Sequence, residues 1–159
     1  MRIISIDPGY ERVGIAVVEK KSSRKEELIY SDCFQTSSKS PITERFLLIG
    51  KEIEKVIQKY KPETMAIETL FFNSNQKTAM KVSEARGIII YQALANGLSV
   101  FEYTPLQIKI AVTGYGRGDK KQIIAMIPHL IKVEKEIKYD DEYDAIAVGL
   151  THSACCKIN

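Results

Sequence analysis

The order of apolar runs along the chain constrains its fold more than any other feature. Three strand-like segments come first, at roughly 1–7, 13–19 and 28–34, and short turn-rich connections join them as in antiparallel hairpins. Helical and strand-like segments then alternate to the end of the chain. This order predicts an α/β fold in which a mixed five-stranded sheet, with three antiparallel N-terminal strands and two parallel strands, is flanked by helices.

The later segments have recognisable starts and stops. Ser40 and Pro41 predict the cap and the first position of a helix, Gly97 predicts the end of another, and Thr104-Pro105 predicts the start of a short one. The expected helices are 42–59, 76–96, the short one after 104, 119–131 and 141–156, and the expected strands are 64–68 and 99–103.

Length and composition favour one compact domain over residues 1–159, since 45% of the 159 residues are hydrophobic. The formal net charge of +3 is too small to indicate a partner. No apolar run is long enough to span a bilayer, so we expect no membrane association and a cytoplasmic location. Cys33, Cys155 and Cys156 lack metal-ligand spacing, which favours a reducing compartment and suggests no chemistry for them.

Four acidic residues stand at places where a metal site can form. Asp7 and Glu68 each close an apolar strand-like run, and Asp141 and Asp144 lie three residues apart at the start of the last helix. Each has an ordinary structural explanation, such as a turn before Pro8-Gly9 or a helix cap. Glu68 is harder to explain in that way, because a carboxylate that ends a buried strand is costly to leave unpaired. Together the four predict one acidic cluster that binds metal.

Several motifs of the chain resemble, in order and spacing, the RuvC family of Holliday-junction resolvases within the ribonuclease H-like superfamily. The similarity runs almost end to end, and single motifs would be weak without the others. The matching segments are Ile6–Gly9, Ala66–Glu68, Glu84–Gly87, Phe101–Tyr103, Gln107–Lys109, Lys120 with Gln122, Asp140–Val148 and Thr151-His152.

The resemblance implies a ribonuclease H-like fold and a metal-dependent endonuclease that acts as a homodimer and nicks a four-way DNA junction symmetrically. Asp7, Glu68, Asp141 and Asp144 would be the catalytic and metal-binding residues, with Asp7 as the bridging ligand of two Mg²⁺ ions or, alternatively, Mn²⁺. Magnesium prefers hard oxygen ligands, and two ions can both activate water and stabilise the leaving oxygen. A branch-migration motor is a further partner that the family suggests.

DNA contacts are expected around a glycine-rich loop with four basic residues, Lys109, Arg117, Lys120 and Lys121, against one acid, Asp119. Lysines near phosphate give salt-sensitive attraction, and by resemblance Lys120 would also stabilise charge at the scissile phosphate. Without the resemblance, solvated surface lysines are an equally good interpretation.

Three further expectations concern an aromatic residue, a histidine and a helix. By resemblance Phe71 stacks on an unpaired base near the junction centre, although most such phenylalanines belong to the core. His152, on an apolar helix, is more often a packed side chain, but in some family members a histidine in this region assists the metal site. The helix from Gln76 to Asn96 is apolar on more than one face, which indicates deep burial or the dimer interface.

Other functions fit parts of the pattern. A ribonuclease H-like enzyme that cleaves structured RNA would share the acidic cluster and the metals. A non-catalytic junction-binding module would require that the acids be structural. An actin-like sugar kinase or ATPase also begins with a strand and an Asp-x-Gly turn, but such chains are much longer than 159 residues.

Overall fold

The structure is a computed structural model that describes residues 1–21, 25–70 and 76–156. Its centre is a sheet of five strands in the order β3-β2-β1-β4-β5. Strands β1, β2 and β3 pair antiparallel, whereas β4 pairs parallel to both β1 and β5. The strands are β1 (Arg2–Asp7), β2 (Arg12–Glu19), β3 (Glu27–Gln35), β4 (Thr64–Glu68) and β5 (Ser99–Tyr103). The mixed five-stranded sheet that the sequence predicted is therefore confirmed.

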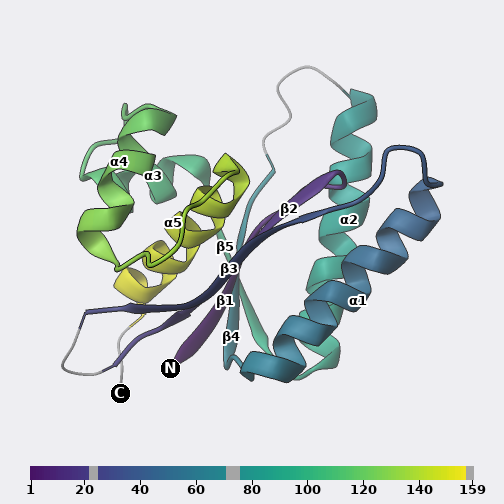
Figure 1. The fold of residues 1–159 in the computed structure, drawn as a ribbon, viewed down its shortest axis with the longest axis horizontal. Helices are drawn as coiled ribbons and strands as arrows, with labels where there is room; N and C mark the ends of the chain where they lie inside the picture. The colour runs from purple at the N-terminus through teal and green to yellow at the C-terminus, as the bar shows by residue number, and fades with distance from the viewer. Residues whose placement is uncertain (22–24, 71–75, 157–159) are drawn as a thin grey trace.

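Five helices among the described residues cover the two faces of the sheet, as Figure 1 shows. Helices α3, α4 and α5 lie on one face, and α1 and α2 lie on the other. Their bounds are α1 (Ile42–Tyr60), α2 (Gln76–Ala95), α3 (Pro105–Thr113), α4 (Lys120–Leu130) and α5 (Asp140–Cys155). No described helix has the length and hydropathy that a bilayer crossing requires.

The expected helix starts lie within one residue of the observed ones, but the cap of α1 differs from the prediction. There the chain at Pro41 is extended, with φ −52° and ψ 145°, so Pro41 itself precedes the helix, and no side chain caps it. The predicted Ser40 cap is therefore wrong by one position. Thr104 and Asp119 do cap α3 and α4 through reciprocal capping boxes with Gln107 and Gln122.

The alternation of side chains along β1 and β4 divides the core into two layers. Ile3 and Ala66 pack with α5, whereas Ile4, Ile6, Met65 and Ile67 pack with α1 and α2. Because successive side chains of a strand point to opposite faces, the last residues, Asp7 and Glu68, project toward the face that α5 covers. Strand alternation thus aims two acids at one helix.

Candidate functional site

Asp7 and Glu68 come together because β1 and β4 are parallel neighbours that end at the same edge of the sheet. Ile6 pairs with Ile67, so the next residue of each strand, Asp7 and Glu68, lies beside the other. Their carboxylates repel each other, and the charge of Glu68 contributes to the raised pKa of Asp7. The sequence expectation that these acids lie in one place fits this geometry.

Helix α5 approaches the same edge through a glycine of β2. Gly14 pairs with Asp7 in the sheet, and a Cβ atom on Gly14 would lie 1.9 Å from the Asp141 carbonyl oxygen and 3.1 Å from Asp7 Cβ. Only a residue without a side chain permits this approach, which brings the first turn of α5 against the strand. The sequence reasoning missed Gly14, although a glycine inside a strand is a recognised signal of close approach.

The negative charge of the resulting cluster is only partly compensated by cations. Burial raises the pKa of Asp7 well above its usual value, and the charges of Glu68, Asp144 and Asp141 raise it further. Burial, together with the charge of Asp144, raises the pKa of Glu68 to about 7. Burial also raises the pKa of Asp144, against the opposing effect of Lys120. Raised pKa values in several neighbouring carboxylates are typical of a functional site.

Lys120 is the cation that the structure brings into this cluster. Its Nζ lies 2.7 Å from Asp144 Oδ2 and 2.7 Å from Asp140 Oδ2. Lys109 and Lys120 line a cavity of about 250 Å³ together with Glu68 and Asp144, and Pro105, Ile108 and Ile123 complete the lining. The two lysines of the predicted basic patch, Lys109 and Lys120, therefore lie beside the two carboxylates Glu68 and Asp144.

Two arginines that the sequence reasoning missed support the acids. Arg12 Nη1 lies 3.4 Å from Asp141 Oδ2, and the Cys33 thiol lies 4.0 Å from the same oxygen. Arg86 on α2 donates from Nε to the Glu68 carbonyl oxygen at 3.2 Å and pairs with Glu102 at 2.6 Å. Arg86 stands inside the matching segment Glu84–Gly87, so its position in that motif was the available signal.

His152 lies elsewhere. It is fully buried, 2.7 Å from Tyr103 Oη through Nδ1 and 3.2 Å from Thr64 Oγ1 through Nε2. Thr64 begins the strand that Glu68 ends, and His152 is eight residues after Asp144, about 12 Å along the helix. The structure does not bring His152 to the carboxylates, and its contacts favour the packed, hydrogen-bonded alternative.

The remaining predicted DNA contacts are placed only in part. Arg117 lies exposed in the connection between α3 and α4, and Lys121 lies exposed in the first turn of α4, but neither lines the cavity. Phe71 falls outside the described residues.

The carboxylates suit a divalent cation in chemistry, but the described residues do not form a finished coordination site. No group of three or more His, Cys, Asp or Glu side chains in the described part of the chain has the arrangement of a ready-made metal site. The donors are hard oxygens, they repel one another, and Asp144 is neutralised by an ammonium group. A cation would relieve this repulsion, so the chemistry of the residues present fits a divalent metal.

Comparison with known proteins places this site in a family. The family model described as crossover junction endodeoxyribonuclease RuvC matches residues 3–152. The chain belongs to the RuvC family. A RuvC relative from Desulfitobacterium hafniense is 43% identical over 153 residues, covering 96% of this chain and 92% of the relative, and one from Finegoldia magna is 43% identical over 152 residues with the same coverage.

Solved structures agree with the RuvC assignment. A structure of T. thermophilus RuvC in complex with Holliday junction substrate has a TM-score of 0.89 and 31% identity, covering 96% of this chain and 93% of the other. The yeast mitochondrial Holliday junction resolvase has a TM-score of 0.72 at 11% identity, covering 95% of this chain and 77% of the other, which is similarity of fold alone.

Proposed function

We propose that this chain is a metal-dependent crossover junction endodeoxyribonuclease that resolves four-way DNA junctions by paired symmetric nicks, in DNA recombination and repair. One observation carries the proposal: carboxylates from β1, β4 and α5 converge beside a lysine-lined cavity in a RuvC-family chain. The curated relatives are named crossover junction endodeoxyribonucleases, and the T. thermophilus relative was solved with a Holliday junction.

In this proposal the four acids, Asp7, Glu68, Asp141 and Asp144, are the metal ligands. Two Mg²⁺ ions, or Mn²⁺ in their place, would supply an activated water and neutralise the leaving oxygen. Asp7, whose pKa is raised by the charges of all three other acids, is the proposed bridging ligand. Partial burial raises the pKa values of Asp7, Glu68 and Asp144, and a bound cation would favour their charged forms.

The lysines act on the DNA. Lys109 and Lys120 line the cavity together with Glu68 and Asp144, so in this proposal they contact the phosphate that is cleaved. Lys120 would also stabilise negative charge that develops there, since a fixed cation in a partly buried site costs no rearrangement during the reaction. Arg117 and Lys121, exposed nearby, would attract the backbone, and Phe71 would stack on an unpaired base.

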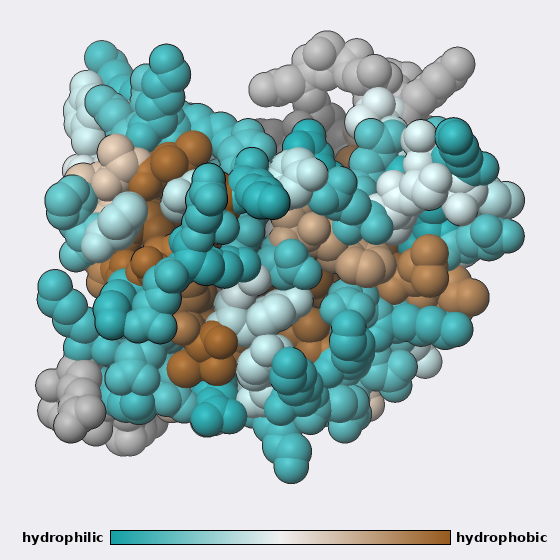
Figure 2. All heavy atoms as spheres, viewed as in Figure 1, coloured by the Kyte–Doolittle hydropathy of each residue, from teal (hydrophilic) through white to brown (hydrophobic). Residues whose placement is uncertain are grey.

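The homodimer is proposed to form through α2. This helix buries Ala85, Ile89 and Ala93 in the core but leaves Met80, Tyr91 and Leu94 exposed by 65%, 67% and 60%. Apolar side chains of that size on one exposed helix are typical of an interface with another subunit. Leu47 and Leu48 on the neighbouring α1 are exposed as well. Figure 2 shows brown, hydrophobic surface on the side of the molecule where α1 lies. A branch-migration motor as partner and a cytoplasmic location remain predictions.

The central experiment tests substrate, metal and residue together. Wild type and Asp7→Asn would each be incubated with an immobile four-way junction, a linear duplex of the same sequence and structured RNA, with and without Mg²⁺. We expect nicking only by wild type, only with Mg²⁺, and preferentially on the junction, at symmetric positions in two strands.

Other outcomes favour the alternatives. Preferential cleavage of the RNA would indicate a ribonuclease, and tight junction binding without nicking would indicate a non-catalytic binding module. Sedimentation of wild type across a range of concentrations tests the dimer, and a monomer at every concentration would exclude it.

A further inference from the structure

Lys120 has two carboxylate partners that play different structural roles. Lys120 begins α4, and its ammonium group bridges Asp140, the first residue of α5, and Asp144, one turn later, with both distances 2.7 Å. Asp144 lines the cavity beside Glu68, whereas Asp140 does not line it. The side chain of Asp140 is also more exposed, at 48% against 21% for Asp144. Asp140 is therefore placed to hold Lys120 from outside the cavity.

A cation that binds Asp144 competes with Lys120 for the same carboxylate. Asp144 Oδ2 already accepts from Lys120, so a metal must displace the ammonium group or share the carboxylate with it. An ammonium without another partner would be left beside a divalent cation, and this repulsion lowers metal affinity. Asp140 offers Lys120 a partner that does not line the cavity.

We propose that Asp140 is a positioning residue: it retains the Lys120 ammonium when Asp144 turns to a divalent cation, so that metal and lysine occupy the site together. The inference rests on the proposed function, since it takes Asp144 as a ligand and Lys120 as a phosphate contact. The Asp140 carboxylate contacts Lys120 at 2.7 Å and does not line the cavity that Asp144 and Glu68 line. Asp140 is thus an anchor for Lys120 and not a ligand itself.

A double-mutant cycle separates this role from a general effect of charge. Mg²⁺ affinity would be measured by calorimetry on DNA-free wild type, Asp140→Asn, Lys120→Ala and the double variant. We expect Asp140→Asn to weaken Mg²⁺ binding about threefold, a size typical of a solvent-exposed ion pair. Lys120→Ala should tighten binding, because the competing cation is gone. In the Lys120→Ala background, Asp140→Asn should then change the affinity by no more than the control does.

The control is Asp32→Asn, which removes the same charge from β3. Asp32 accepts from the Cys33 backbone N–H and lies near the Tyr30 hydroxyl, so it is engaged with its own strand. Asp140→Glu is the rescue variant, since it keeps a carboxylate that can reach Lys120, and it should bind Mg²⁺ within a factor of two of wild type.

Each outcome decides the proposal. An Asp140→Asn loss of the same size in both backgrounds would overturn it, because Asp140 would then act by its own charge or as a ligand. An unchanged affinity in the wild-type background would overturn it too. Junction nicking by wild type tests the proposed function separately, so a positive cycle without nicking would leave Asp140 assigned and refute the nuclease. If wild type bound no Mg²⁺, both would fail.

Discussion

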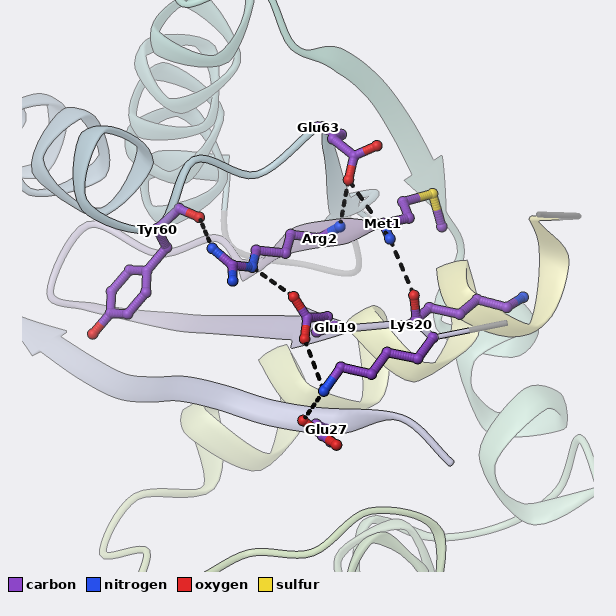
Figure 3. A network of polar contacts seen from close by, with 8 residues as sticks. Met1, Arg2, Glu19, Lys20, Glu27, Tyr60 and Glu63 are labelled. Atoms are coloured by element: carbon purple, nitrogen blue, oxygen red, sulfur yellow. Dashed lines mark hydrogen bonds and ion pairs between the residues drawn. The ribbon is translucent and has the colours of Figure 1, made fainter. Parts of the chain in front are cut away.

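Charged side chains are paired at one end of the central sheet and crowded with like charges at the other. At the end where β1 begins, Arg2 donates from Nε to Glu19 at 2.8 Å and from Nη1 to the Tyr60 carbonyl at 3.1 Å, and its backbone N–H donates to Glu63, as Figure 3 shows. The hydrogen bond from Arg2 lowers the pKa of Glu19. At the end where β1 stops, burial and neighbouring carboxylates raise the pKa values of Asp7 and Glu68.

This difference separates stability from function within one sheet. Charges at the first end are matched by partners of the same chain, so the folded state satisfies them without help. At the second end Lys120 and Arg12 only partly offset the repulsion among the carboxylates, which costs stability in the metal-free protein and provides affinity for a cation. Clusters of neighbouring carboxylates with raised pKa values are found mainly at functional sites, where they bind a ligand or take part in catalysis.

The largest expected effect is on catalysis, from Asp7 at the end of the sheet where β1 stops. Asp7→Asn removes the proposed bridging ligand, so the nicking rate should fall by about 10³-fold or more, in keeping with a metal contribution of several kcal/mol. The same substitution removes a repelling charge, so the metal-free variant should melt at a temperature equal to or higher than wild type. Junction nicking and thermal unfolding without metal measure the two effects. An Asp7→Asn enzyme with wild-type turnover would remove Asp7 from the site.

The second largest effect is expected on stability, from His152, which packs away from the carboxylates. His152→Ala would leave the Tyr103 hydroxyl without its partner and open a cavity beside Phe101, whose ring centroid lies 4.6 Å from the imidazole. We expect a loss of about 2 to 4 kcal/mol in the free energy of unfolding. Turnover by the folded fraction should be unchanged. Denaturant titration and single-turnover nicking at low temperature separate the two.

His152→Gln is the matched control, because glutamine keeps a hydrogen-bonding group near Tyr103 and should recover part of the stability. A large loss of turnover in this variant, with stability preserved, would return His152 to the candidate site.

The sequence predicted the acidic cluster because its determinants are local. Asp7 and Glu68 each end an apolar strand, and parallel neighbours end at one edge, so strand order alone brings the two acids together. The supporting contacts could not be predicted in this way. Tertiary packing alone brings Gly14 to Asp141, where α5 meets β2, and Lys120 to Asp140, where α4 meets α5. No local sequence pattern encodes how these elements pack. The wrong cap of α1 is local too, since Pro41 can either begin or precede a helix.

The third prediction uses Mg²⁺ and pH to compare the two ends. In metal-free protein the folded state binds more protons than the unfolded state between the usual glutamate pKa of 4.5 and the folded Glu68 pKa of about 7. Stability from this group is therefore lost as pH rises through that window. Mg²⁺ binds the deprotonated carboxylates, so it should stabilise more at pH 8 than at pH 5.5.

The size of that stabilisation is set by mass action. At about 100 times the dissociation constant, Mg²⁺ should add roughly 2.7 kcal/mol, and a domain of this size gains about 2 to 4 °C for each kcal/mol. Melting curves at the two pH values, for wild type and Asp7→Asn, measure it. An equal shift in both proteins would count against shared coordination by Asp7.

The smallest effect is expected from Glu19→Gln, at the end where charges are paired. The variant loses the ion pairs of Glu19 with Arg2 at 2.8 Å and with Lys21 at 3.3 Å. Both partners are partly exposed, so solvent screens the pairs and the loss at pH 7 should be below about 1 kcal/mol. The folded pKa of Glu19 is lowered, so its contribution is present above the usual value of 4.5 and is lost as pH falls through the folded pKa. If Glu19→Gln lowers the melting temperature of the metal-free protein and Asp7→Asn raises it, the two sheet ends differ in how their charges are paired and not in how many charges they have. Equal signs would mean that the repulsion around Asp7 is already relieved in the metal-free protein.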